Sequence, residues 1–315
     1  MIPSNTTQAA FKDWINVHRL SLEKMRTVLS PVQFREVLLA MLGLKVSRVL
    51  LTEHELLALH PLFSSTKVNY FFLSTPVYVR PDSLKGSWSS FFAHEGGRGD
   101  LAIHYLTYIA REEDQIARAM ESESLSDHRH LGQLMQIPEC CIDSFVRNFQ
   151  KTEMKGLDPI RATIYQTPFS LNLDPWCNIA SQYFGFSLLS FTPCSFHCLN
   201  ASLIARFTHQ LLTFFDEDLA RQFVDHQYSL YIDSDLNGVH MIKKFMIRAD
   251  GHIQYDPGNV ESTYTGDPVY LQLRIGNQLW ATSFHQFLVF RDDIVLFQSR
   301  GDRYSLLSFS HDRAK

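Results

Sequence analysis

The chain has 315 residues, of which 45% are hydrophobic, 20% are charged and 13% are aromatic, and its formal net charge at pH 7 is −4. These values describe an ordinary globular protein, long enough for one large domain or two moderate ones. The weak negative charge and the lack of a basic run argue against nucleic acid as a main partner.

The N-terminal residues and the use of cysteine bear on location. Residues 1–8 lack the basic and apolar regions of a secretory signal, and no apolar stretch is long enough to span a membrane. The five cysteines are an odd number and include an adjacent pair, which suits a disulfide framework poorly. We therefore expect a cytoplasmic protein without a membrane partner.

The first part of the chain alternates between helical and extended patterns. Helical periodicity predicts one helix over residues 6–29, with His18 packed among its apolar residues, and a second from Pro31 to about Gly43. The segments that follow are predicted to be a strand at Ser47–Thr52, a helix at Glu53–His60, a strand at Val68–Ser74, a loop at Pro76–Trp88, a strand or helix at Leu101–Ala110 and a helix from Arg111 to about Met120.

Two polar segments in this part are weaker functional candidates. The segment 94–100 is rich in glycine but lacks the Lys-Ser/Thr of a P-loop, so a turn is the favoured interpretation. Its His94 and Glu95 are kept as a minor catalytic candidate. His128 and His130 are interpreted first as polar residues at a helix start and second as metal ligands.

The central third of the chain holds four of the five cysteines, in two clusters that each follow a proline. Cys140 and Cys141 follow Pro138, at the start of a helix predicted to run to about Phe149. The second cluster comes after a strand expected at 185–191. There, Thr192 as N-cap and Pro193 as first helical residue would place Cys194 and Cys198 one turn apart on the same helix face. Further helix is expected to about residue 226.

The C-terminal part changes to a period of two, with turn residues between short runs. Its predicted strands are Tyr228–Ile232, Val239–Ile247, His252–Tyr255, Val269–Leu273, Gln278–Ala281, Gln286–Phe290, Ile294–Phe297 and Tyr304–Phe309. The sequence therefore predicts an α+β fold, with a mixed α/β region over residues 1–226 and a β-rich module, a small barrel or sheet, over residues 227–315.

Three interpretations of the cysteine clusters remain open. A thiol in the first turn of a helix faces unpaired N–H groups and the positive end of the dipole, which favours the thiolate that a metal ligand or nucleophile needs. The favoured interpretation is a metal site, with Cys140, Cys141, Cys194 and Cys198 as ligands. The others are a cysteine nucleophile and simple packing of small apolar side chains. Cys177 stands alone and is interpreted as core.

The kind of metal is argued from spacing. Adjacent cysteines do not form a zinc knuckle, and successive helical side chains point about 100° apart, so Cys140 and Cys141 are expected to reach one small ion only from the turn before the helix. A cluster accepts ligands from a wider arc, so an iron–sulfur cluster is favoured slightly over zinc. In the nucleophile alternative, His197 would serve Cys194 from three residues away on the helix as a catalytic base.

The two clusters resemble motifs of an uncharacterised prokaryotic protein family. Its members carry Leu-Gly-x3-Gly-Tyr-Pro-x-Cys-Cys-x3-Phe and, further on, His-x-Pro-Cys-Ser-x2-Cys-x2-Ser. The matching residues are Leu131, Gly132, Pro138, Cys140, Cys141, Phe145, Pro193, Cys194, Ser195, Cys198 and Ser202. This chain has Gln136-Ile137 in place of Gly-Tyr and has no histidine near Phe191-Thr192. The resemblance supports the importance of the four cysteines and implies no particular reaction.

The resulting functional hypothesis is a cytoplasmic metalloenzyme that acts on a small molecule or a peptide in a pocket rich in Phe and Tyr. Two alternatives are retained. One is a non-enzymatic binding module stabilised by zinc, and the other is an enzyme with a cysteine nucleophile for sulfur or acyl transfer.

Overall fold

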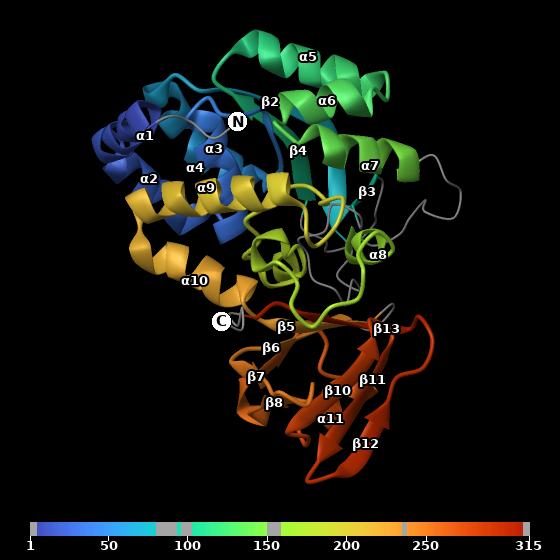
Figure 1. The fold of residues 1–315 in the computed structure, drawn as a ribbon. Helices are drawn as coiled ribbons and strands as arrows, with labels where there is room; N and C mark the ends of the chain where they lie inside the picture. The colour runs from blue at the N-terminus through green and yellow to red at the C-terminus, as the bar shows by residue number, and fades with distance from the viewer. Residues whose placement is uncertain (1–4, 80–92, 96–102, 150–158, 235–237, 311–315) are drawn as a thin grey trace.

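The computed structural model describes residues 5–79, 93–95, 103–149, 159–234 and 238–310. Its elements form an α+β fold in which all strand pairs are antiparallel, as Figure 1 shows. The helices α1–α10 and a first sheet lie at one end of the molecule, and strands β5–β13 lie at the other. Within the described ranges, no helix has both the length and the apolar character needed to cross a bilayer.

The first sheet has the strand order β1-β4-β2-β3. Its strands and the helices before and between them are α1 (Asn5–Val17), α2 (Arg19–Val28), α3 (Pro31–Met41), β1 (Ser47–Thr52), α4 (Glu53–Thr66), β2 (Asn69–Val79), β3 (Ala93–Glu95) and β4 (Ile103–Ala110). β1 is an edge strand and pairs with β4 from Ser47 opposite Ile109 to Thr52 opposite His104.

Helix α3 is the central helix of the larger core. Ser30 and Gln33 form a capping box at its start, with Pro31 as the first helical residue. Its residues 33–41 are all buried, and Phe34 packs against Phe215 with 4.9 Å between ring centroids. This burial includes Arg35 and Glu36, two charged residues that need partners inside the protein.

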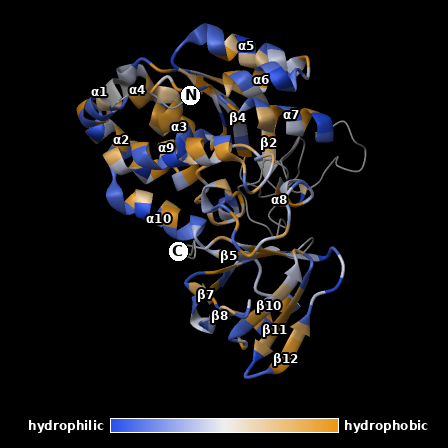
Figure 2. Cartoon of the chain, viewed as in Figure 1, coloured by the Kyte–Doolittle hydropathy of each residue, from blue (hydrophilic) through white to orange (hydrophobic). Residues whose placement is uncertain are grey.

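The middle of the chain is helical and carries the cysteines. Its elements are α5 (Glu113–Ser124), α6 (His128–Leu134), α7 (Glu139–Phe149), α8 (Pro159–Ile164), the 3-10 turns η3 (Pro175–Cys177) and η4 (Ala180–Phe184), α9 (Leu199–Phe215) and α10 (Glu217–Gln227). Figure 2 shows hydrophilic residues along the outer side of α5. Its buried residues, Ile116, Ala119 and Ser122, recur every third position, as expected for a helix with one side against the protein.

The C-terminal part contains two more sheets, with strand orders β13-β5-β6-β9 and β12-β11-β10-β8-β7. The elements are β5 (Leu230–Ser234), β6 (Gly238–Ile242), β7 (Phe245–Ile247), β8 (Ile253–Tyr255), η5 (Pro257–Asn259), β9 (Val260–Ser262), α11 (Pro268–Leu273), β10 (Gln278–Ser283), β11 (Gln286–Arg291), β12 (Ile294–Gln298) and β13 (Tyr304–Ser308).

Strand β5 is buried on both faces because it separates two cores. All five of its residues are buried. Tyr231 belongs to the larger core with the helices, whereas Leu230 and Ile232 belong to the core of the C-terminal strands. Alternate side chains of a strand point to opposite faces, which explains this division. The boundary at residues 226 and 227 stays a prediction.

Five predicted elements outside the cysteine clusters differ in the structure. The helix over 6–29 is two helices, divided at His18, whose ring packs on Trp14 with 4.4 Å between centroids. The strand over 239–247 is divided into β6 and β7 by Lys244, which has a left-handed φ of 56°. The loop at 76–88 is strand through Val79, and its remaining residues lie outside the described ranges.

The other two differences have clear causes. Residues 269–273 form helix α11 instead of a strand, because Asp267 accepts a hydrogen bond from the Val269 N–H and Pro268 starts the helix. Residues 185–191 are not a strand. The carbonyl oxygens of Ser187 and Leu189 accept hydrogen bonds from the Arg35 guanidinium, so this backbone is satisfied without a neighbouring strand.

Candidate metal centre

Four cysteine sulfurs meet between α7 and the start of α9. The Sγ atoms of Cys140, Cys141, Cys194 and Cys198, hereafter the four-cysteine group, all lie within 4.8 Å of one another. Cys140 Sγ is 3.9 Å from Cys141 Sγ, and Cys198 Sγ is 3.7 Å from each of these two. The prediction that the two sequence clusters come together within metal-binding distance is confirmed.

Helix α7 supplies the first pair. The Pro138 carbonyl accepts hydrogen bonds from the N–H groups of Cys141 and Ile142, which starts the helix directly after the proline. The two cysteines therefore lie in the first helical turn. The sequence alone leads us to expect that two ligands of one ion lie in the turn before the helix. Because Cα–Cβ bonds in a helix lean toward its N-terminus, both sulfurs project over this open end, where Cys198 meets them.

The second pair comes from an irregular segment. The predicted helix at Pro193 is wrong, because α9 begins at Leu199 and Cys198 is its N-cap residue. The backbone of the preceding segment bonds to distant residues, which prevents helical bonding. Thr163 Oγ1 donates to the Pro193 carbonyl at 3.3 Å, and the Phe196 N–H donates to Thr167 Oγ1 at 3.0 Å.

The same segment is fixed further by burial and by its contact with α7. Phe196 is fully buried and packs edge-on against Phe309 with 5.4 Å between centroids. The Cys194 N–H donates to Cys141 Sγ at 3.4 Å. The buried Cys177 thiol donates to the Cys198 carbonyl at 3.3 Å, so the fifth cysteine supports this backbone from below the group.

The four-cysteine group favours one thiolate, at Cys198. Hydrogen bonding from the Cys141 thiol, aided by the Ala201 N–H at the start of α9, lowers the pKa of Cys198 to about 5 in spite of its burial. Donating that hydrogen bond and being buried raise the pKa of Cys141. Burial, together with hydrogen bonding to Cys198, raises the pKa of Cys194 to about 12. A bound cation would therefore displace protons from the other thiols.

Among the side chains that the structure describes, none of the predicted histidine candidates joins the four-cysteine group. His197 is exposed in the turn before α9, so the helical spacing on which its pairing with Cys194 depends does not occur. Its catalytic role stays a prediction. His128 and His130 begin α6, where the Asp127 carboxylate accepts from the His130 N–H. His94 and Glu95 belong to strand β3, and the structure describes their backbone but not their side chains.

A pocket of about 480 Å³ lies beside the four-cysteine group. One side is formed by the connection between α6 and α7, and the other by one face of α9. The residues that line it are Gln133, Gln136, Ile137, Pro138, Glu139, Asn200, Leu203, Ile204 and Phe207. We call it the α9 pocket. Asn200 connects it to the sulfurs, since its side-chain amide donates to Cys140 Sγ at 3.5 Å. The expected wealth of Phe and Tyr is absent from this lining, where Phe207 is the single aromatic residue.

Gln136 in this lining has an unusual backbone conformation. It is left-handed, with φ at 57°, in the short connection from α6 to α7. Glycine adopts this conformation without strain, and the resembling family has glycine at this position. Gly132, one turn earlier, lies so close to α7 that a Cβ atom there would be 2.9 Å from Ile142 Cγ1. The left-handed backbone at Gln136 and the close approach at Gly132 both belong to the tight hairpin of α6 and α7 that presents Cys140 and Cys141.

Comparison with known proteins adds no function. No protein-family model, curated protein or solved structure matches the chain. The resemblance of the cysteine motifs to a prokaryotic family stays a prediction, and the functional proposal depends on the geometry of the site.

Proposed function

We propose that the four-cysteine group binds a single tetrahedral metal ion, most favourably zinc, and that this ion holds together the walls of a ligand pocket. The observation behind the proposal is the spacing of the sulfurs. Four sulfurs that are each about 2.3 Å from one ion, at tetrahedral angles, are about 3.8 Å apart. The three Sγ–Sγ distances among Cys140, Cys141 and Cys198 are 3.7–3.9 Å, and Cys194 Sγ lies within 4.8 Å of each of them.

This spacing supports one ion over an iron–sulfur cluster. A cluster divides its four thiolates among two or four irons, and bridging sulfides occupy the middle of the site, so thiolates on different irons must stand further apart than the ligands of one ion. The slight preference for iron–sulfur from the sequence depended on the adjacent cysteines being unable to converge. Because Cys140 and Cys141 do converge over the first turn of α7, that argument no longer applies.

The position of the four-cysteine group supports a structural role. Four thiolate ligands fill a tetrahedral zinc shell, and a filled shell is the usual form of a structural site. The ion would join the start of α7 to the start of α9, which are the two walls of the α9 pocket. The pocket combines apolar residues of α9, namely Leu203, Ile204 and Phe207, with amide groups at its edge. We propose a small molecule or peptide with apolar and polar parts as its ligand.

Metal analysis of the purified chain and of matched variants tests the proposal. We expect anaerobically prepared wild type to contain zinc in a ratio near one per chain and to lack visible absorption, and its cobalt-substituted form to be coloured. Cys194→Ala should lose the metal, because three thiolates remain. Cys177→Ala removes a buried thiol outside the four-cysteine group and should retain it. Wild type without stoichiometric metal would overturn the proposal, and several irons with sulfide would replace the single ion by a cluster.

A metalloenzyme is the second candidate, and the exposure of Cys140 favours it. Cys140 is half-buried, and its sulfur accepts a hydrogen bond from the amide of Asn200, a residue that lines the α9 pocket. A zinc-bound thiolate at this edge could react with a bound substrate or be displaced by it. Treatment of the zinc-loaded protein with iodoacetamide separates the two candidates. Selective modification of Cys140 supports the enzyme, whereas protection of all four thiols supports the structural centre.

A further inference from the structure

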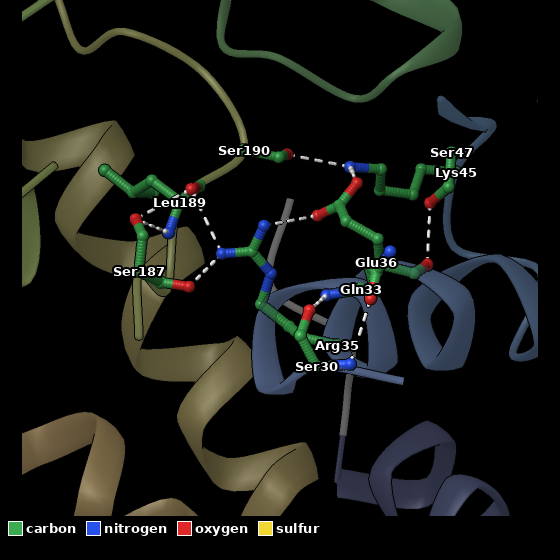
Figure 3. A network of polar contacts seen from close by, with 9 residues as sticks. All are labelled: Ser30, Gln33, Arg35, Glu36, Lys45, Ser47, Ser187, Leu189 and Ser190. Atoms are coloured by element: carbon green, nitrogen blue, oxygen red, sulfur yellow. Dashed lines mark hydrogen bonds and ion pairs between the residues drawn. The ribbon is translucent and has the colours of Figure 1, made fainter. Parts of the chain in front are cut away.

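A buried network of charged residues joins α3 to the segment 187–190 (Figure 3). The Glu36 carboxylate accepts from Arg35 Nη2 and from Lys45 Nζ, each at 2.7 Å. Lys45 Nζ also donates to Ser190 Oγ at 2.8 Å, and Arg35 Nη1 donates to the Leu189 carbonyl at 3.0 Å. All three charged residues are less than 10% exposed. The network contains two cationic groups and one carboxylate.

A cavity of about 260 Å³ lies beside this network. Its walls come from α3, from the edge strand β1, from η4 and from the segment 187–190. The residues that line it include Arg35, Arg48, Leu50, Gln182 and Ser190. We call it the α3 cavity. It is distinct from the α9 pocket, and the two have no lining residue in common.

Three buried donors on this lining have no hydrogen-bond partner. They are Arg35 Nε, Arg48 Nε and Gln182 Nε2. Arg35 is 1% exposed, so water cannot freely replace a missing partner at its Nε. A buried donor without an acceptor costs folding free energy. Three such donors line one cavity, and a single ligand with several acceptor atoms would satisfy all of them.

The acidic residues on the same lining are already engaged. Both oxygens of Glu36 accept from Arg35 and Lys45. Glu55 Oε2 accepts from the Thr52 N–H at 2.6 Å in the capping box of α4. Three donors on the lining are therefore without a partner, whereas both oxygens of Glu36 and one oxygen of Glu55 are engaged, which favours a ligand that accepts hydrogen bonds.

We propose that the α3 cavity binds a small oxyanion, a carboxylate or a phosphate group, which accepts hydrogen bonds from Arg35, Arg48 and Gln182. Each arginine has its Nε as the donor without a partner, and an oxygen of a carboxylate or of a phosphate can accept this charge-assisted hydrogen bond equally well. The anion would also balance the second cation of the buried network. This site is independent of the metal proposed for the four-cysteine group, so either can fail without the other.

Thermal unfolding and calorimetric titration test the site with three sodium salts at equal ionic strength, namely phosphate, acetate and chloride. We expect phosphate or acetate to raise the Tm of wild type by about 1–3 °C above its value in chloride. The salt that both raises the Tm and gives a saturable heat of binding identifies the kind of oxyanion, because phosphate also stabilises folded proteins by exclusion from their surface. Equal Tm values in all three salts, with no heat of binding, would overturn the proposal.

Variants at the less buried donors show whether binding occurs in this cavity, since a change at the buried Arg35 would disturb the fold. Arg48→Gln and Gln182→Leu should each weaken anion binding, the first by about tenfold as a charge-assisted hydrogen bond is lost. Arg26→Gln is the matched control. Arg48 pairs with the carboxylate of Glu123 at 2.7 Å, and Arg26 pairs with that of Asp216. The two arginine side chains are similarly exposed, 32% for Arg48 and 39% for Arg26, but Arg26 lies outside the cavity. Equal affinities of the Arg48 and Arg26 variants would contradict the assignment.

Discussion

Cys198 belongs both to the start of a helix and to the sulfur contacts between distant segments of the candidate centre. It is the N-cap of α9, accepts hydrogen bonds from other thiols of the four-cysteine group and has a pKa lowered to about 5. The sequence predicts a thiolate at a helix start on general grounds, and the lowered pKa of Cys198 agrees with that prediction. Its position in the helix differs, because α9 starts at Leu199 and not at Pro193, so Cys198 is the N-cap residue and not a residue of the second turn.

The first prediction concerns Gln136, which has a left-handed backbone with φ at 57°. A non-glycine residue pays about 1 kcal/mol or more for this conformation, so Gln136→Gly should raise the free energy of unfolding by about 0.5–1 kcal/mol. Urea unfolding measures the change. Gln133→Gly is the matched control within helix α6, and it should lower the stability by about 1 kcal/mol. A loss of stability in both variants would show that Gln136 is not strained.

At the scale of elements, the α6–α7 hairpin is the unit that presents two of the four cysteines. Arg129 of α6 forms ion pairs with Glu139 and Asp143 of α7 at the surface. Such exposed pairs add little stability, so the close contact of Gly132 with Ile142 is the stronger constraint. The sequence predicts both helices, but the periodicity of each helix alone does not show how closely they approach.

The second prediction follows from that contact. Gly132→Ala places a methyl group 2.9 Å from Ile142 Cγ1, so α6 and α7 must separate or Ile142 must shift. We expect a loss of about 1–3 kcal/mol in the free energy of unfolding, as for other overpacked interiors, together with weaker metal retention. The double variant Gly132→Ala, Ile142→Val removes one methyl group at the contact and should recover part of both. If Gly132→Ala alone equals wild type, the helices are not in close contact.

At the scale of the whole molecule, the buried network around Glu36 joins segments about 150 residues apart in the chain. Arg35 reaches Ser187 and Leu189 across sequence separations of 152 and 154 residues. Burial by itself would raise the pKa of Glu36, but the charges of Lys45 and Arg35 hold it at about 2. Burial lowers the pKa of Lys45, although the negative charge of Glu36 acts to raise it. The stabilising effect of the ion pair therefore shows in the lowered pKa of the Glu36 carboxyl.

The third prediction is the pH dependence that results. A free glutamate takes up its proton near pH 4.5 and folded Glu36 near pH 2, so the unfolded state binds more protons between these values. The contribution of Glu36, about 3 kcal/mol, is complete above about pH 5 and is lost as the pH falls toward 2. Denaturant unfolding from pH 6 to pH 2 should therefore show a shallower decline in Glu36→Gln than in wild type.

Two further measurements complete this test. Glu36→Gln should also be destabilised at pH 7 by about 3–5 kcal/mol, because Arg35 and Lys45 remain buried without their carboxylate. Glu261→Gln removes a half-exposed carboxylate that pairs with Lys243, and its pH profile should follow that of wild type. Parallel profiles for Glu36→Gln and wild type would contradict the assigned pKa.

The sequence by itself determined the α+β class, most of the helices and strands, and the four residues that form the candidate centre. Periodicity, proline positions and capping residues are local signals, and they act within one or two turns. The tertiary structure alone decided that the Cys140 and Cys141 sulfurs converge with Cys198, that residues 185–191 are not a strand, and that Arg35 and Glu36 lie inside the protein. Each of these outcomes depends on hydrogen bonds or burial between segments far apart in the chain, and no local pattern reports such partners.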